Sequence, residues 1–243
     1  MLQTQLLGML PEGGSDAWTA PVPPTREEVL PELRPSMKPG ELISEILKTN
    51  PGVFLGDEHG SSAIPEFLSN SMSSFRDSGV KRLYVEMFNS DHQPMLDRFW
   101  EQGDNRQDLV AHLEMNGWNK AEGWPERVVS MLESAKKAGI RPIGIDTAHT
   151  GSSRLETANP HWVSVIQAHE AEASDRGLYV VWGGSGHSAN FPRNKGVDWR
   201  LGIPSVDLGD SASISVPEVT TADGRSSDFR VTLPMHSGGQ PNP

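Results

Sequence analysis

Apolar and polar residues alternate along the chain in blocks that predict a repeated strand–helix order. Short apolar runs of the length expected for buried strands occur at residues 53–55, 82–87 and 141–146. Between the first two runs, apolar residues recur at helical spacing over residues 62–75, with Ser62 as a candidate N-cap and Gly79 after the segment. This order predicts a strand–helix–strand unit, whose crossover is expected to be right-handed.

The following segment, residues 94–138, is longer than one crossover requires. Its apolar residues keep helical spacing, and glycines at positions 103, 117 and 123 divide it into what we expect to be three helices. We expect part of this segment to form a cap over the rim of the sheet. Further along, we expect a helix over residues 162–176 and a strand over residues 178–182.

The C-terminal part of the chain has a different pattern. β-like runs at residues 203–208, 212–219 and 228–233 indicate edge strands or a hairpin. Together the pattern predicts an α/β fold, with a mainly parallel central sheet flanked by helices, a helical cap insertion and β-strands near the C-terminus. We expect a flexible leader over residues 1–40, because residues 11–40 are rich in proline and poor in apolar residues. A single domain over residues 41–236 and a disordered tail over residues 237–243 complete the expected organisation.

Composition narrows the functional classes. The chain has 243 residues, enough for one large core, and it contains no cysteine, which excludes disulfides, thiolate metal sites and a cysteine nucleophile. A formal net charge of −11 argues against a nucleic-acid partner. No apolar stretch approaches the roughly 18 residues that a membrane span needs. The N-terminus lacks the basic start and long apolar segment of a secretory signal peptide, so export by the general pathway is not expected.

Candidate chemistry lies at the ends of the expected strands. The phrases Gly56-Asp57-Glu58-His59 and Gly184-Ser185-Gly186-His187 each follow a short apolar run, and Glu86 lies within the run at 82–87. If these runs are neighbouring parallel strands, their carboxyl ends deliver two imidazoles and several carboxylates to one rim, where open α/β sheets bind ligands. The sequence therefore predicts a reactive pocket that contains His59, Glu86 and His187.

The acidic residues around His59 have more than one interpretation. On an extended segment Asp57 and His59 would face one side and Glu58 the other. Asp57 could orient the His59 ring or share a metal with it, whereas the plain structural alternative is a strand end with solvated polar groups. Burying Glu86 without a partner would cost several kcal/mol, so we expect this carboxylate either on a solvated rim or paired inside the protein.

The segment around His187 allows several interpretations. Gly184, Ser185 and Gly186 leave room for close approach and could supply backbone donors, although a plain glycine turn with an exposed histidine would read the same way. A dinucleotide fingerprint is disfavoured because no helix pattern follows, and a nucleophile elbow fails because His187 replaces its last glycine. Asp146, at the end of another expected strand, is a candidate for a supporting or substrate contact. A divalent metal held by His59, His187 and Glu86 is a variant of the same site.

The order of these motifs resembles the superfamily that unites erythromycin esterases, ChaN-like haem-binding lipoproteins, TIKI/TraB proteins and a domain of the Pasteurella toxin. In that group the first motif usually reads Gly-Glu-x-His, and this chain has Asp57 in place of the glutamate. The resemblance covers roughly residues 50–190, and it implies the fold and the positions of His59, Glu86 and His187. Members carry out ester hydrolysis, metal-dependent proteolysis or haem binding, so the fold does not select one activity.

The acidic, cysteine-free chain with its Ser/Pro-rich start is also similar to the HopBA effectors of plant-pathogenic bacteria. That resemblance implies type III secretion into a host cell, an unidentified protein or small-molecule target there, and a role in host cell death. We expect a hydrolase-like site in which one histidine acts as general base on water and Glu86 orients it. The alternative is a non-catalytic binding module, either a haem or metal carrier, with Tyr84 and Tyr179 as the available tyrosines, or a host-protein recognition domain.

Overall fold

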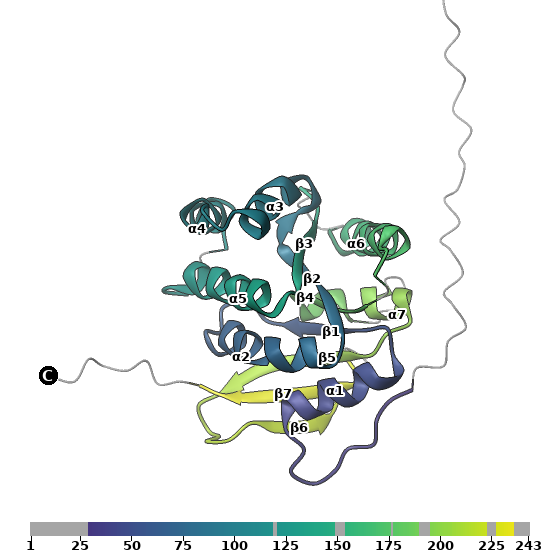
Figure 1. Cartoon of the computed structure of the whole chain (residues 1–243). Coiled ribbons are helices and arrows are strands. Elements are labelled where there is room, and N and C mark those ends of the chain that lie inside the picture. The colour runs from purple at the N-terminus through teal and green to yellow at the C-terminus, as the bar shows by residue number, and fades with distance from the viewer. Residues whose placement is uncertain are drawn as a thin grey trace, which may run out of the picture.

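The computed structural model describes residues 29–118, 121–148, 154–175, 177–189, 195–222 and 227–235. In these residues seven strands form one sheet in the order β3-β2-β4-β1-β5-β7-β6 (Figure 1). The strands are β1 (Gly52–Asp57), β2 (Val80–Asn89), β3 (Arg141–Asp146), β4 (Leu178–Gly184), β5 (Ser205–Ser211), β6 (Glu218–Thr221) and β7 (Phe229–Pro234). Every described pairing is parallel except that of β6 with β7.

The three central strands carry the predicted motifs. β4 lies between β2 and β1, with Val85 opposite Trp182 on one side and Asp57 opposite Gly184 on the other. Because parallel strands end at the same edge of a sheet, the carboxyl ends of β1, β2 and β4 form one continuous rim. The mainly parallel α/β fold expected from the sequence is confirmed, including the adjacency of the strands that bear the motifs.

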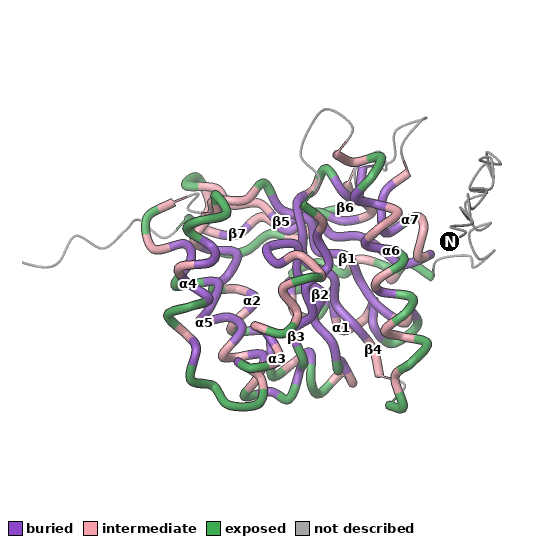
Figure 2. Tube along the Cα trace, turned by 90° about the horizontal axis from the view of Figure 1, so that it is seen from above, coloured by how far each residue is buried: buried purple, intermediate pink, exposed green. Residues whose placement is uncertain are grey.

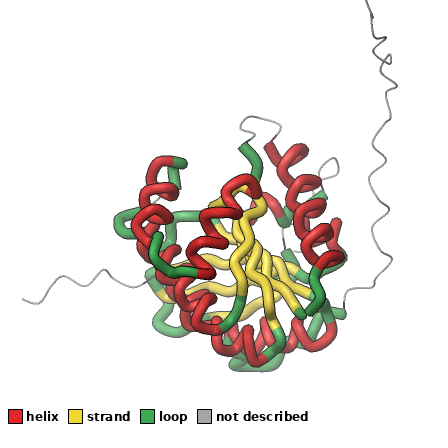
Figure 3. The backbone as a smooth tube through the Cα atoms, turned by 45° about the horizontal axis from the view of Figure 1, so that its top comes forward, coloured by secondary structure: helices red, strands yellow, loops and turns green. Residues whose placement is uncertain are grey.

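Helices enclose the sheet on both faces (Figure 3). They are α1 (Pro39–Thr49), α2 (Ala63–Asp77), α3 (Gln93–Glu101), α4 (Arg106–Met115), α5 (Trp124–Ala138), α6 (Arg154–Glu172) and α7 (Val197–Leu201), with single 3-10 turns at η1 (Ser90–His92) and η2 (Ser185–His187). In the described part of the chain none of these helices is long and apolar enough to cross a membrane.

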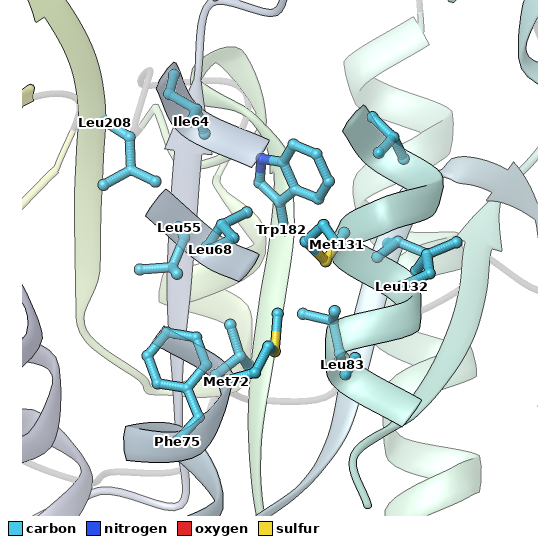
Figure 4. Close-up of a cluster of buried hydrophobic side chains, with 14 of the residues drawn as sticks. Leu55, Ile64, Leu68, Met72, Phe75, Leu83, Met131, Leu132, Trp182 and Leu208 are labelled. Atoms are coloured by element: carbon cyan, nitrogen blue, oxygen red, sulfur yellow. The ribbon is translucent and has the colours of Figure 1, made fainter. Parts of the chain in front are cut away.

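The central strands are buried on both faces, as their near-continuous apolar sequences require (Figure 2). On one face an apolar cluster joins the sheet to α2 and α5, and Figure 4 shows Leu55 and Trp182 of the sheet facing Leu68 of α2 and Met131 of α5. On the other face a second cluster, which includes Trp162, packs α6 and α7 against the strands. The sheet therefore carries a packed apolar layer on each face beneath its rim.

Several element boundaries differ from the sequence expectations. Helix α6 begins at Arg154 rather than at residue 162. Helix α1 was not expected, and its first two residues, Pro39 and Gly40, lie in the expected leader. Met37 is buried, so packing starts before residue 41, whereas residues 1–28 and 237–243 of the expected leader and tail lie outside the described residues. Strand β5 is internal rather than an edge strand, and β6 with β7 forms the expected antiparallel pair.

Candidate functional site

The buried carboxylate of Glu86 is the centre of the rim. Its Oε2 accepts a hydrogen bond from the backbone N–H of Gly184 at 2.6 Å and lies 3.2 Å from Nε2 of His59. Its Oε1 accepts a hydrogen bond from Nη2 of Arg154 at 2.9 Å and lies 3.4 Å from Nε2 of His187. The structure thus brings His59, Glu86 and His187 together from three neighbouring strand ends.

His59 is held in an unusual backbone conformation directly after β1. Its φ is 45°, in the left-handed region, and the chain turns further at Gly60, whose φ is 120°. For a residue with a Cβ this conformation costs on the order of 1–3 kcal/mol, and such strain clusters at functional sites. The turn aims the imidazole back towards Glu86. The rings of His59 and Trp118, which lies in the α4–α5 connection, meet nearly at right angles with 5.0 Å between centroids.

Two carboxylates flank the His59 ring. Its Nδ1 lies 2.5 Å from Oδ1 of Asp57, a close charge contact that lacks the alignment of a hydrogen bond, and its Nε2 faces Glu86. Burial opposes the charged imidazolium, but the contacts with Asp57 and Glu86 outweigh it and raise the pKa of His59 to about 10. His59 is therefore positively charged at neutral pH.

Glu86 responds to the same contacts in the opposite sense. Burial alone would raise its pKa, but hydrogen bonding and charge attraction from His187 and His59 hold the pKa of Glu86 well below its usual range. The carboxylate is therefore ionised and paired inside the protein, which is the second of the two environments expected for it from the sequence.

His187 lies in η2, directly after β4, and is 4% exposed. Its Nδ1 is 2.6 Å from Oδ1 of Asn159 on α6, and its ring stacks on Trp162 with 4.0 Å between centroids. Ser185 and Gly186 form the tight turn that brings the ring inward. His187 is therefore fixed on one edge by an amide and on one face by an aromatic ring.

The glycines before η2 provide the space that this arrangement needs. A Cβ at Gly183 would lie 2.8 Å from the ring of Trp162, and a Cβ at Gly184 would lie 2.9 Å from Nε2 of His59. Both separations are shorter than non-bonded atoms tolerate, so a side chain at either position would displace a ring of the site. The glycine-rich sequence here serves close packing as well as backbone hydrogen bonding.

Asp146 and Arg154 support Glu86 from the side of β3. Nη2 of Arg154 lies 3.0 Å from both carboxylate oxygens of Asp146, and the indole N–H of Trp162 donates to Asp146 Oδ1 at 3.2 Å. Burial disfavours the charged guanidinium, but Asp146 and Glu86 raise the pKa of Arg154 further above its ordinary value. Asp146, a candidate from the sequence, holds the cation that neutralises Glu86.

Asp57 and Glu58 face different surroundings, as the alternation of side chains predicts. Asp57 is buried and accepts a hydrogen bond from the indole N–H of Trp182 at 3.3 Å, whereas Glu58 is exposed. Glu58 and His59 line a cleft of about 610 Å³ together with residues that include Asp207 and Arg230. Glu86 and His187 are buried and do not line this cleft, so His59 is the member of the three that the cleft exposes.

The donor atoms do not suit the metal variant of the site. Within the described ranges, no three His, Asp or Glu side chains are arranged to hold a metal ion. The oxygens of Glu86 accept hydrogen bonds from Arg154 and Gly184, and the guanidinium of Arg154 already supplies a positive charge to this carboxylate. For haem, Tyr84 is unsuitable because it is fully buried and its hydroxyl donates to Glu170 at 2.7 Å.

Sequence reasoning missed Arg154, Asn159 and the contact of Trp118 with His59. A usable signal existed for Asn159, which continues the helical spacing of the apolar residues Trp162, Val163 and Ile166 by one more turn. A polar residue on the buried face of a helix needs a partner, and that requirement could have pointed to the site.

Comparisons with known proteins identify the family of the chain. A family model described as type III effector protein HopBA1 matches residues 46–223. The HopBA1 effector of Pseudomonas syringae pv. aptata is 29% identical over 170 residues, covering 64% of this chain and 70% of that protein.

Solved structures show the same fold. The structure of the type III effector HopBA1 matches with a TM-score of 0.70 and 21% identity, covering 85% of this chain and 98% of that one. RRSP, a MARTX toxin effector domain from Vibrio vulnificus, matches with a TM-score of 0.55 and 21% identity, covering 82% of this chain and 38% of that one. Because the family model spans most of its length, the chain belongs to the HopBA1 family of type III effector proteins.

Proposed function

We propose that this protein is an effector that a bacterium delivers into a host cell by type III secretion, where it acts as a hydrolase-type enzyme whose activity triggers cell death. Membership of the HopBA1 family supports the delivery. The chemistry is supported by one observation above the others: a single buried carboxylate, Glu86, contacts two imidazoles at the carboxyl rim of the sheet.

His59 is the electrophilic group in this proposal. It carries positive charge at neutral pH, since its pKa is raised to about 10, and it lines the cleft. A substrate carbonyl in the cleft would develop negative charge during attack by water, and a fixed imidazolium stabilises that charge. The Nε2 proton, shared with Glu86, can pass to the leaving group.

His187 is the general base. A base must be able to accept a proton, and His59 is excluded from that role because it is already protonated. Nε2 of His187 lies 3.4 Å from Oε1 of Glu86, so a water beside this pair would have an acceptor in the imidazole and an orienting anion in the carboxylate. In this proposal the two imidazoles that contact one carboxylate divide the roles of acid and base.

The experiment is expression of matched variants in host leaf tissue, with ion leakage as the measure of cell death. His59→Gln and Glu86→Gln each remove a charged group without changing the size of the side chain greatly, and we expect both to abolish leakage while circular dichroism remains that of a folded protein. His169→Gln on α6 and Glu101→Gln on α3 are the matched controls, because both lie outside the site, and we expect normal leakage.

Full leakage from folded His59→Gln and Glu86→Gln proteins would contradict the enzymatic proposal. Such a result would indicate action by contact alone, as a host-protein recognition domain, in which surface substitutions rather than substitutions at the rim eliminate the effect.

A further inference from the structure

We infer that Asn159 is a positioning residue that fixes a proton on Nδ1 of His187, so that Nε2, the nitrogen facing Glu86, is the one that exchanges a proton. The structural part of this inference stands on contacts alone. Its catalytic consequence rests on the proposed function, because it determines which nitrogen of His187 can accept a proton from water.

Asn159 makes its contact from a fully buried position. It lies on α6 with 0% exposure, and its Oδ1 is 2.6 Å from Nδ1 of His187. This distance is slightly shorter than the usual range for N–H···O hydrogen bonds, so one of the two atoms must carry a proton directed at the other. The identity of the donor therefore decides the tautomer.

The backbone determines the orientation of the Asn159 amide. Its Nδ2 donates to the carbonyl oxygen of Lys195 at 3.2 Å. A carbonyl oxygen can only accept, so the NH₂ group must face Lys195 and the amide oxygen must face His187. With the amide reversed, two acceptor oxygens would meet in a buried site, which costs the free energy of an unsatisfied polar group.

The amide oxygen of Asn159 cannot donate, so Nδ1 of His187 must carry the proton. A neutral imidazole has one ring proton, which leaves Nε2 with its lone pair. Nε2 faces the carboxylate of Glu86, with 3.4 Å between Nε2 and Oε1. Stacking on Trp162, with an interplanar angle of 21°, holds the ring in this orientation.

This assignment gives Asn159 a defined role. It acts through His187 rather than on substrate, and it keeps Nε2, the nitrogen nearest to Glu86, as the proton acceptor. A carboxylate at the same position would also accept from Nδ1, whereas an apolar side chain of similar size would not.

The test is imidazole ¹⁵N NMR of the full-length protein at a pH at which His187 is neutral, with its signals identified by their loss in His187→Gln. We expect wild type and Asn159→Asp to show a protonated Nδ1 and an unprotonated Nε2. In Asn159→Leu we expect the preference for the Nδ1–H tautomer to fall about tenfold, as loss of one hydrogen bond implies. Asn105→Leu, which replaces another buried asparagine outside the site, should leave the signals unchanged.

A protonated Nε2 in the wild-type protein would overturn the inference, and that spectrum is decisive even if Asn159→Leu fails to fold. An unchanged tautomer in folded Asn159→Leu would overturn it as well. In leaf tissue we expect Asn159→Leu to lose cell-death activity and Asn159→Asp to retain it. The NMR signals that report the tautomer need no substrate. Cell death from the His59→Gln and Glu86→Gln proteins would contradict the proposed hydrolase function and leave this inference standing. A protonated Nε2 would contradict this inference and leave the hydrolase function open.

Discussion

The backbone N–H of Gly184 donates a hydrogen bond to Oε2 of Glu86 across 2.6 Å, which ties the end of β4 to the middle of the rim. Gly184 is paired with Asp57 of β1 on its other side. The contact therefore connects the strand that carries Glu86 with the strand that leads to His59, and it requires the backbone of β4 to approach closely.

Substitution of Gly184 by alanine should break this approach. The added Cβ would lie 2.9 Å from Nε2 of His59, so the imidazole must move away from Glu86. We expect Gly184→Ala to lose most cell-death activity and to lower the free energy of unfolding by about 1–3 kcal/mol, as overpacking does. Leaf ion leakage and urea unfolding measure the two effects.

Gly40→Ala is the control for this substitution, because no heavy atom lies within 4 Å of the added Cβ. Gly40 is in α1, where alanine is favoured over glycine, so stability should hold or rise slightly. Normal stability together with normal activity in Gly184→Ala would show that the close approach has no functional importance.

Glu86 should make the free energy of unfolding decrease as the pH falls into the acid range. Its pKa in the folded protein is well below the unfolded value of 4.5, so its stabilisation is fully present above that value and is lost as the pH falls towards the folded pKa. We expect Glu86→Gln to lower the free energy of unfolding at neutral pH by about 3–5 kcal/mol, since it leaves charged partners without their anion.

The measurement is urea unfolding of wild type and Glu86→Gln at several pH values from neutral down to about 3, a range that spans the ordinary carboxyl pKa. The difference between the two proteins should shrink steadily as the pH falls. Glu101→Gln, at an exposed position, should match wild type throughout. A difference that stays constant with pH would mean that Glu86 is not an ionised partner of the site.

Arg154 should be needed to stabilise the ionised carboxylate of Glu86. Arg154→Met removes the cation that lies between Glu86 and Asp146. The two carboxylates then lose the positive charge that they share. We expect a loss of about 1–3 kcal/mol in the free energy of unfolding, the range for hydrogen bonds to charged groups, and a clear loss of cell death. Arg106→Met, which breaks the half-buried pair with Glu133, should keep full activity. Equal activity in the two variants would rule out a role for Arg154.

Strand ends were the part of the site that the sequence could predict. Gly56 to His59, Glu86 and Gly184 to His187 each follow or lie in an apolar run, and parallel sheets place such ends on one rim. The order of the strands could not be derived from local patterns, because adjacency in the sheet depends on contacts between distant segments.

The helix-borne partners were harder to predict. Asn159 precedes Pro160, and proline disfavours helical geometry at the residue before it and removes a backbone donor, so the pattern predicted a later start for α6. Helix α1 was also missed because of a proline. Pro39 and Gly40 continue the proline- and glycine-rich composition of the leader, which hid the start of the helix, although proline suits the first turn of a helix. Side-chain partners on such segments follow from tertiary packing alone.

The central claim is that buried carboxylates keep His59 charged beside the cleft. The direct measurement is an NMR titration of the His59 imidazole, assigned by the loss of its signals in His59→Gln. We predict a pKa of about 10 in the wild-type protein, with a lower value in Glu86→Gln because one of the two anionic partners is gone. A wild-type His59 that titrates near its ordinary value of 6.5 would contradict the claim.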